Sequence, residues 1–310
     1  MNDNDAKVPV WLRILQFPPI RLFLLGYPLF YCLGYSNAFM EQNKGNVLPM
    51  IVAAMGMVAL AMWVYVGFAR FVERRAPADL ALVPGMRELG IGMLVGSGLY
   101  TAGVLVLLAM GIMRIEGTNP VSVMLPAISM AISSGFLEEL LFRGALFRIV
   151  EEWLGSWISV VVSSVVFGAV HLMNPTATLT GAIFISIEAG LLLAAAYMLT
   201  RRLWLGIGFH ISWNYTQSAV FGGIVSGGVA EPGLFKTVTE GPELLTGANF
   251  GLEASLVPCI LATTAGIILV VKAVRRGHVA QPFWSRARPD VGPSTRQAGL
   301  GQASALPPRL

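Results

Sequence analysis

Two acids and an arginine lie inside an apolar run, Ser133 to Phe147, with the sequence SSGFLEELLFRGALF. Glu139 and Arg143 are four residues apart, so on a helix they share one face, with the acid on the N-terminal side that favours an ion pair. Glu138 then points elsewhere and is free to face a cavity, where a desolvated carboxylate suits proton transfer. The segment predicts a charged pair supporting a second, reactive acid. The alternative is that Glu139 and Arg143 form an ion pair near the membrane interface, with their side chains extending to the membrane surface.

Two of the three histidines lie in apolar segments. His171 ends the phrase FGAVH, four residues after Phe167, and His210 begins HISWN, four residues before Asn214. Each pair therefore shares one face of a helix. A lone histidine in a membrane span usually bonds a neighbouring helix. Two histidines together with an acid and an amide on neighbouring spans favour a functional site instead. The third, His278, lies in the C-terminal tail and receives no role.

These groups suffice for attack by water on a carbonyl. Glu138 takes the proton of the water, the imidazoles hold water or a metal, and Asn214 donates to the developing oxyanion. Glu138, His171 and His210 also form a two-histidine, one-carboxylate set that suits Zn²⁺, although the HExxH spacing is absent. Metal-assisted and metal-free mechanisms are both compatible with these residues. A nucleophilic route is less favoured, since no motif fixes a base beside the nearby serines, Ser133, Ser134 and Ser212.

Three motifs, EELLFR, FGAVH and LWLGIGFHISWN, resemble in type and order those of the CPBP (Abi, CAAX-processing) family of intramembrane proteases. This family includes relatives of the type II CAAX prenyl endopeptidases. The resemblance is strongest from Val123 to Asn214. It implies an eight-span helical bundle whose site opens toward the cytoplasmic leaflet, and cleavage of a peptide bond near a substrate C-terminus.

The resemblance also implies roles for six residues: Glu138, Glu139, Arg143, His171, His210 and Asn214. Glu138 would activate the water, with the next acid and the arginine in support. The two histidines would position water or a metal such as Zn²⁺, and the asparagine would contribute to the oxyanion site. The family is described as metalloproteases, and a metal-free glutamate mechanism has also been proposed for it.

Composition is typical of a polytopic membrane protein. Of 310 residues, 55% are hydrophobic and only 12% are charged, and the mean hydropathy is +0.69. At about 20 apolar residues per crossing, eight spans begin near Leu22, Val47, Gly90, Val123, Ser156, Thr178, Trp204 and Leu256. We therefore predict an all-α fold, a membrane bundle of about eight transmembrane helices. Its expected partners are the lipid bilayer and a peptide or membrane-protein substrate.

The positive charges orient the chain. With both termini cytoplasmic, the predicted outer loops hold only Lys44, Arg114 and Lys236 of the 21 basic residues, as the positive-inside rule requires. The sequence pI near 9.3 thus reflects topology, and nucleic-acid binding is excluded. We expect an integral protein of a bacterial inner membrane.

The chain divides into three parts. Residues 1–21 form a cytoplasmic segment, and 22–274 form the transmembrane protease-like domain. Within that domain 123–225 is the motif core, and 226–255 is an outer Gly-rich loop, a lid or half-buried hairpin. Residues 275–310, rich in Pro, Gly, Arg and Ser, predict a disordered basic tail.

The expected depth of His171 in the membrane differs from that of the other site residues. At 1.5 Å per residue, Glu138 lies roughly 15 to 18 Å from the cytoplasmic edge and His171 about 24 Å. The mismatch predicts that the fifth span begins later than Ser156, with residues 151–158 along the interface.

Glu188, in the sixth span, belongs to none of the three motifs. Acids inside membranes usually pair, so we expect a partner in Arg143 or a histidine; adjustment of the site's protonation is the alternative.

An intramembrane endopeptidase is thus the leading hypothesis, with an esterase or amidase of the same water chemistry within it. A non-catalytic scaffold or immunity protein that keeps the motifs for packing is the second. The third is a proton-coupled transporter or channel, because acids and histidines on adjacent spans also form proton relays.

Overall fold

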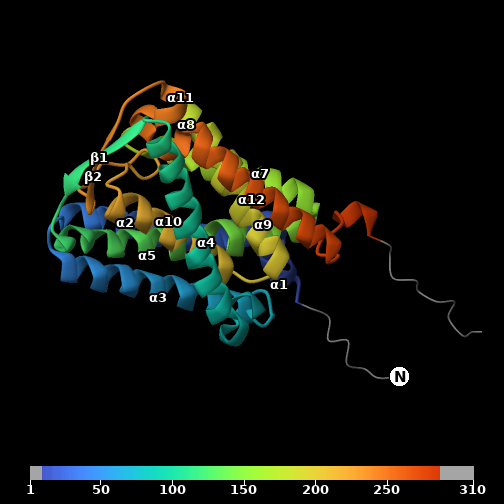
Figure 1. The fold of residues 1–310 in the computed structure, drawn as a ribbon. Coiled ribbons are helices and arrows are strands. Elements are labelled where there is room, and N and C mark those ends of the chain that lie inside the picture. The colour runs from blue at the N-terminus through green and yellow to red at the C-terminus, as the bar shows by residue number, and fades with distance from the viewer. Residues whose placement is uncertain (1–8, 287–310) are drawn as a thin grey trace, which may run out of the picture.

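The computed structural model describes residues 9–286, and most of these residues are helical (Figure 1). The helices are α1 Val10–Leu15, α2 Pro18–Gln42, α3 Val47–Phe71, α4 Leu82–Ala109, α5 Pro126–Glu138, α6 Arg148–Leu154, α7 Ser156–Val170, α8 Leu179–Ile185, α9 Leu191–Thr200, α10 Trp204–Tyr215, α11 Glu243–Thr246 and α12 Leu256–Arg275. Strands β1 Met113–Thr118 and β2 Phe235–Thr239 are the sheet elements of the described part. The all-α prediction is confirmed.

Three π-helical stretches interrupt the central helices. They are η3 Glu139–Phe147 after α5, η5 Ser186–Gly190 between α8 and α9, and η6 Thr216–Val220 after α10. Each follows or contains polar residues identified in the sequence. A π-helical turn is rare and is often found at functional sites.

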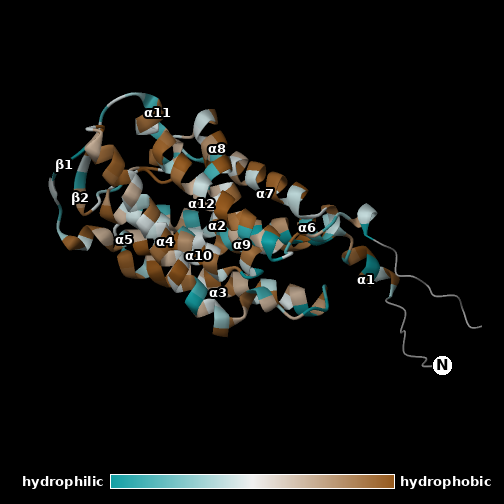
Figure 2. Ribbon diagram, turned by 45° about the vertical axis from the view of Figure 1, so that its right-hand side comes forward, coloured by the Kyte–Doolittle hydropathy of each residue, from teal (hydrophilic) through white to brown (hydrophobic). Residues whose placement is uncertain are grey.

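Helices occupy all eight positions expected for membrane spans. Within residues 9–286, six helical segments are long and apolar enough to cross a membrane: Val47–Phe71, Leu82–Ala109, Val121–Leu154, Ser156–Met173, Leu179–Thr200 and Leu256–Arg275. Hydrophobic residues dominate the helices and polar ones concentrate toward their ends (Figure 2). The chain is therefore an integral membrane bundle. The count of eight crossings stays a prediction, because α2, which contains Pro28, and the short α10 are outside these six.

Glycines allow α4 and α10 to approach closely. A β-carbon on Gly92 would overlap the backbone carbonyl of Leu205, and one on Gly96 would overlap the carbonyl of Phe209. Such small-residue contacts let membrane helices pack at short distance. By contrast, Gly90, on the same helix, faces open space. The contact fixes α10, which carries His210, within the bundle.

Ion pairs gather at the end of the bundle where α1 and the end of α12 lie (Figure 1). Glu73 binds Arg21 at 2.6 Å and Arg148 at 2.9 Å, and Glu151 binds Arg201 at 2.5 Å. Each pair joins residues at or near the ends of different helices, so the pairs tie the helix ends together. The clustering agrees with the basic loops expected on one side; the cytoplasmic orientation of the termini stays a prediction.

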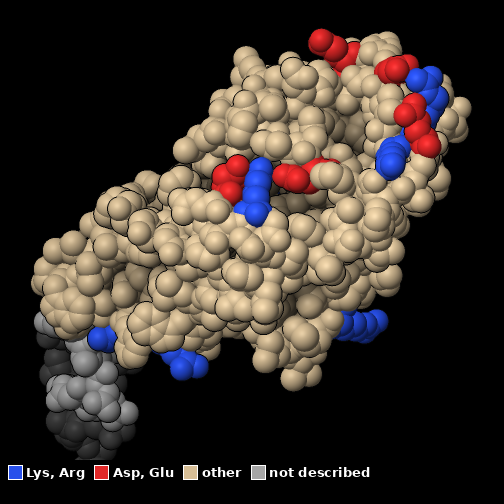
Figure 3. All heavy atoms as spheres, turned by 90° about the vertical axis from the view of Figure 1, so that its left-hand side faces the viewer, with Lys and Arg blue, Asp and Glu red and all other residues tan. Residues whose placement is uncertain are grey.

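The opposite end carries β1, β2 and the outer loop. The strands pair antiparallel, with an irregularity between Ile115 and Gly117. The expected half-buried hairpin is wrong, because β2 pairs with the segment after α4 instead of within its own loop. Phe250 is fully buried, so the loop is folded onto the bundle. Viewed from this end, the surface is mostly uncharged, with charges in small groups (Figure 3).

Part of the expected disordered tail, 275–310, is ordered. Ala280 exchanges two hydrogen bonds with Ser156, at 3.0 and 2.8 Å. Gly155 has φ +82° and lies so close to this segment that a β-carbon would press on Ala280. This local fit, invisible in composition, holds the first part of the tail against α7. The remainder of the tail and the start of the N-terminal segment lie outside residues 9–286.

Candidate active site

Glu139 and Arg143 form a buried ion pair, as their spacing predicted. Arg143 Nη1 donates to Glu139 Oε1 at 2.9 Å, and the side chains are 0% and 1% exposed. Arg143 Nη2 donates to the carbonyls of Ala189 and Gly190, both at 3.3 Å. The guanidinium also lies over the Phe167 ring, 4.6 Å from its centroid. Arg143 thus joins the first motif to η5 and to the second motif.

His210 lies between the two acids of the first motif. Its Nδ1 is 3.1 Å from Glu139 Oε1, and its Nε2 is 3.7 Å from Glu138 Oε2. Because Glu139 Oε1 also accepts a hydrogen bond from Arg143, we assign the Nδ1 proton to the bond with Glu139. Nε2 then faces Glu138 at a distance too long for a direct hydrogen bond.

Glu138 differs from its neighbour in having an unengaged oxygen. Oε2 is buried and has no hydrogen-bond partner among the described residues. The side chain is 13% exposed, against 1% for Glu139. The predicted pair of Glu139 with Arg143 is thus observed, with His210 as a further partner, whereas Glu138 keeps one oxygen without a partner among the described residues.

Asn214 ties α10 to α5. Its Nδ2 donates to Ser134 Oγ at 2.9 Å, and Ser134 precedes Glu138 by one helical turn. The contact sets the register between the HISWN helix and the acid-bearing helix. Gly206 has a related role that the sequence did not reveal, because a β-carbon there would lie 2.8 Å from Glu139 Oε2.

His171 occupies the end of α7, where the helix tightens into the short turn His171–Met173. Its Nδ1 is 2.7 Å from the carbonyl of Phe167, so Nδ1 donates and Nε2 is left as acceptor. The imidazole lies against the Phe167 ring, centroids 4.7 Å apart, and Phe167 in turn lies 6.1 Å from His210. The Phe167 ring therefore lies beside both motif histidines.

The expected late start of the fifth span is wrong. Helix α7 begins at Ser156, directly after Gly155, and Glu151 is buried at the end of the bundle. In Figure 1, α7 runs obliquely to α3 and α5. A tilted helix advances less far into the membrane per residue. His171 can therefore lie near the other site residues although it is at the far end of α7.

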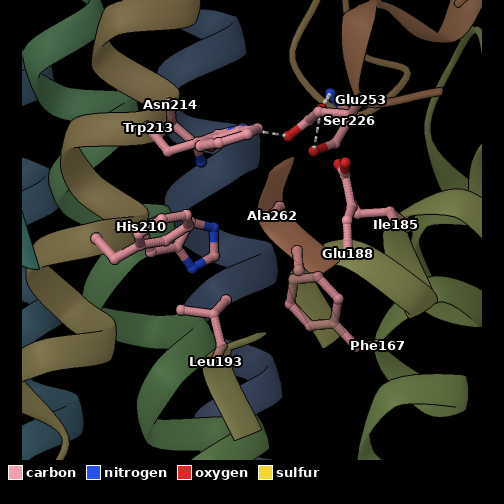
Figure 4. Close-up of a pocket in the computed structure, with 12 residues that line it drawn as sticks. Phe167, Ile185, Glu188, Leu193, His210, Trp213, Asn214, Ser226, Glu253 and Ala262 are labelled. Atoms are coloured by element: carbon pink, nitrogen blue, oxygen red, sulfur yellow. Dashed lines mark hydrogen bonds between the residues drawn. The ribbon is translucent and has the colours of Figure 1, made fainter. Parts of the chain in front are cut away.

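A small cavity lies between α10 and the outer loop (Figure 4). Its volume is about 10 Å³, and its polar lining comes from His210, Asn214, Glu188, Ser226 and Glu253. The last two belong to the outer loop and were not predicted from the sequence. An acid beside an apolar span, in GLEASL, was the available signal.

Glu253 fastens the outer loop to α10. It accepts hydrogen bonds from Trp213 Nε1 at 3.2 Å and Gln217 Nε2 at 3.3 Å. From the loop, Ser226 contributes its backbone N–H at 2.5 Å and its hydroxyl at 2.9 Å. With four donors Glu253 is fully satisfied although it is only 2% exposed.

Glu188 is the exception in this cluster. The expected pairing with Arg143 or a histidine is wrong, because Arg143 bonds Glu139 and the carbonyls beside Glu188. Neither carboxylate oxygen of Glu188 has a hydrogen-bond partner in the described part of the chain.

The proposed zinc ligands do not form a metal-binding set here. Within residues 9–286, no group of three or more His, Cys, Asp or Glu side chains is arranged to hold a metal ion. Glu139, rather than Glu138, bonds His210 directly, and His171 Nδ1 bonds the backbone carbonyl of Phe167. The residues present therefore do not fit a bound metal in this arrangement.

Residues 120–216 match a family model described as Type II CAAX prenyl endopeptidase Rce1-like. This segment is therefore similar to the Rce1-like family. It contains all six predicted site residues, so the resemblance drawn from the three motifs is confirmed. The Rce1-like segment also contains Glu188, whereas Ser226 and Glu253 lie beyond it. No curated protein and no solved structure matches the chain.

Proposed function

We propose that this chain is an intramembrane endopeptidase, in which Glu138 activates water for attack on a peptide bond. The supporting observation is the contrast between the two acids. Glu139 is engaged by Arg143 and His210, whereas Glu138 Oε2 is buried without a partner beside the same imidazole. The Rce1-like match supports the same class of activity.

The reaction begins with a water molecule that donates to Glu138 Oε2. His210 Nε2, 3.7 Å from that oxygen, lies within reach of the same water. Glu138 removes the proton as the water oxygen bonds to the carbonyl carbon. The side chain of Asn214 donates to the resulting oxyanion. When the C–N bond breaks, Glu138 returns the proton to the leaving amine, so that charge and atoms balance.

Arg143 acts through Glu139 and not on the substrate. It donates a hydrogen bond to Glu139, and the Glu139 side chain fixes the Nδ1 proton and the ring plane of His210. The mechanism contains no metal step, because the described side chains are not arranged as a ligand set.

The substrate is proposed to be a peptide or membrane protein within the bilayer. The test is cleavage of a quenched fluorescent peptide library by the purified protein in detergent, with fragments identified by mass spectrometry. We expect defined fragments from the wild type and none from Glu138→Gln. Glu243→Gln, at an exposed position on α11, is the matched control and should cleave normally.

Equal cleavage by the wild type and Glu138→Gln would contradict the proposal. Absence of cleavage by both would contradict it as well, and pH-dependent solute flux in proteoliposomes would then support the transporter alternative.

A further inference from the structure

Glu188 is a buried carboxylate that the proposed reaction does not use. It is 1% exposed, and neither oxygen has a hydrogen-bond partner within the described chain. Ion pairs among residues 9–286 do not include it. A polar group buried without a partner is costly. Such groups are rare in folded proteins and call for a specific explanation.

The carboxylate of Glu188 points into the cavity that His210 and Asn214 line from the opposite side (Figure 4). It is directed toward Glu253 and Ser226. Glu253 already accepts four hydrogen bonds from protein donors and as a carboxylate has no proton to donate. The acceptor capacity of Glu188 is therefore available to a ligand that enters the cavity.

The backbone beside Glu188 is held by the arginine of the first motif. Arg143 Nη2 donates to the carbonyls of Ala189 and Gly190 at 3.3 Å. These carbonyls lie at the end of π-helical η5, where the regular α-helical hydrogen bonds are interrupted. The same guanidinium bonds Glu139. Arg143 thus contacts both Glu139 and the backbone next to Glu188.

We propose that Glu188 is a substrate-binding residue whose carboxylate accepts a hydrogen bond from an N–H donor of the substrate. The donor is a backbone amide or an ammonium group. This inference rests on the proposed endopeptidase function and adds a binding contact to it. The cavity, about 10 Å³, is close to the minimum for one water molecule. The proposed contact therefore requires the Ser226–Glu253 wall, which belongs to the outer loop, to open when a peptide binds.

Binding and chemistry are separated by working in the Glu138→Gln background, with a fluorescent peptide that the wild type cleaves. Glu188→Leu removes the acceptor, and we expect Kd to rise on the order of 10- to 100-fold, the usual effect of leaving a buried donor without its acceptor. Glu188→Gln keeps one carbonyl acceptor and should show a smaller rise. With Glu138 intact, the single-turnover rate at saturating peptide should change by less than about 3-fold.

Two sets of modified peptides identify the donor. N-methylation removes one backbone N–H at a time, while norleucine for lysine and an acetylated N-terminus remove ammonium groups. The modification that eliminates the contact weakens binding to protein with Glu188 and leaves binding to Glu188→Leu unchanged. If every modification has the same effect on both proteins, the contact does not exist.

Thermal unfolding distinguishes a binding role from a structural one. Because Glu188 has no protein partner, Glu188→Leu should unfold at the same temperature as the wild type or higher, as happens when a functional but strained group is removed. Weaker binding together with a lower unfolding temperature would assign Glu188 to structure and overturn the inference. So would an unchanged Kd.

The outcomes separate this inference from the proposed function. If Glu138→Gln cleaves normally, or the wild type cleaves nothing, the endopeptidase proposal fails and the Glu188 contact with it. If cleavage depends on Glu138 but Glu188→Leu binds peptide as tightly as the protein with Glu188, only the Glu188 inference fails.

Discussion

Replacing Arg143 by methionine tests how the site is held together. Methionine keeps an unbranched apolar side chain in a position that is 0% exposed, but it removes the charge and all donors. Glu139 would lose the 2.9 Å bond and keep only His210 Nδ1 at 3.1 Å. The carbonyls of Ala189 and Gly190 would also lose their shared donor.

The loss of unfolding free energy in Arg143→Met follows from the burial of the Glu139–Arg143 ion pair. Removing one partner of a buried ion pair destabilises a protein by about 3–5 kcal/mol, because the other charge is left uncompensated. Replacing both partners by neutral groups is often close to neutral. Arg143→Met alone should therefore cost about 3–5 kcal/mol, and Glu139→Gln combined with Arg143→Met should recover at least about 2 kcal/mol of it.

The measurement is the free energy of unfolding in mixed micelles for the wild type, both single variants and the double variant. Arg114→Met is the matched control, because its pair with Glu240 is 57% and 64% exposed and should contribute less than about 1 kcal/mol. A cost for Arg143→Met as small as that of the control would refute the reasoning. A double variant no more stable than Arg143→Met alone would do the same.

Three further predictions concern packing, pH and metal. Gly92→Ala should destabilise the bundle by about 1–3 kcal/mol through overlap with α10, whereas Gly90→Ala, facing open space, should be neutral or slightly stabilising in the same unfolding assay. Burial alone would raise the pKa of Glu73, but Arg148 and Arg21 lower it below its ordinary value of 4.5. Ionised Glu73 thus contributes stability that is present above that value and lost as pH falls through the lowered pKa. Glu73→Gln should therefore reduce the loss of unfolding free energy at acidic pH. An unchanged loss would count against the pairing of Glu73 with the two arginines. Cleavage should persist after treatment with EDTA or 1,10-phenanthroline, and an activity lost to the chelator and restored by Zn²⁺ would contradict the metal-free mechanism.

The local parts of the site were predictable from the sequence. Glu139 and Arg143 pair because four residues along a helix is a short distance whatever surrounds it. The same spacing placed His171 beside Phe167, and their contact is observed. Apolar stretches long enough to span a membrane likewise predicted the helices, because length and hydropathy are local properties.

The contacts between distant segments were not predictable in this way. Glu188 was expected to pair with Arg143 or a histidine. Instead, Arg143 donates to the backbone carbonyls beside Glu188, and every residue type has such a carbonyl, so the sequence does not reveal this contact. Glu253 is 39 positions beyond Asn214 in the numbering and reaches α10 only because the outer loop folds back. The ordered conformation of the tail near Ala280 depends on Gly155, which lies over a hundred residues earlier in the chain.

The central claim is that Glu138 activates the attacking water. The most direct test is the single-turnover cleavage rate of the wild type and Glu138→Gln with a saturating peptide, with Kd measured for both. A general base typically contributes 10²- to 10⁴-fold, so the variant should be slower by roughly that factor while Kd stays within about 3-fold. A rate within about 10-fold of the wild type at equal Kd would contradict the claim, because a glutamine cannot accept the proton of the water.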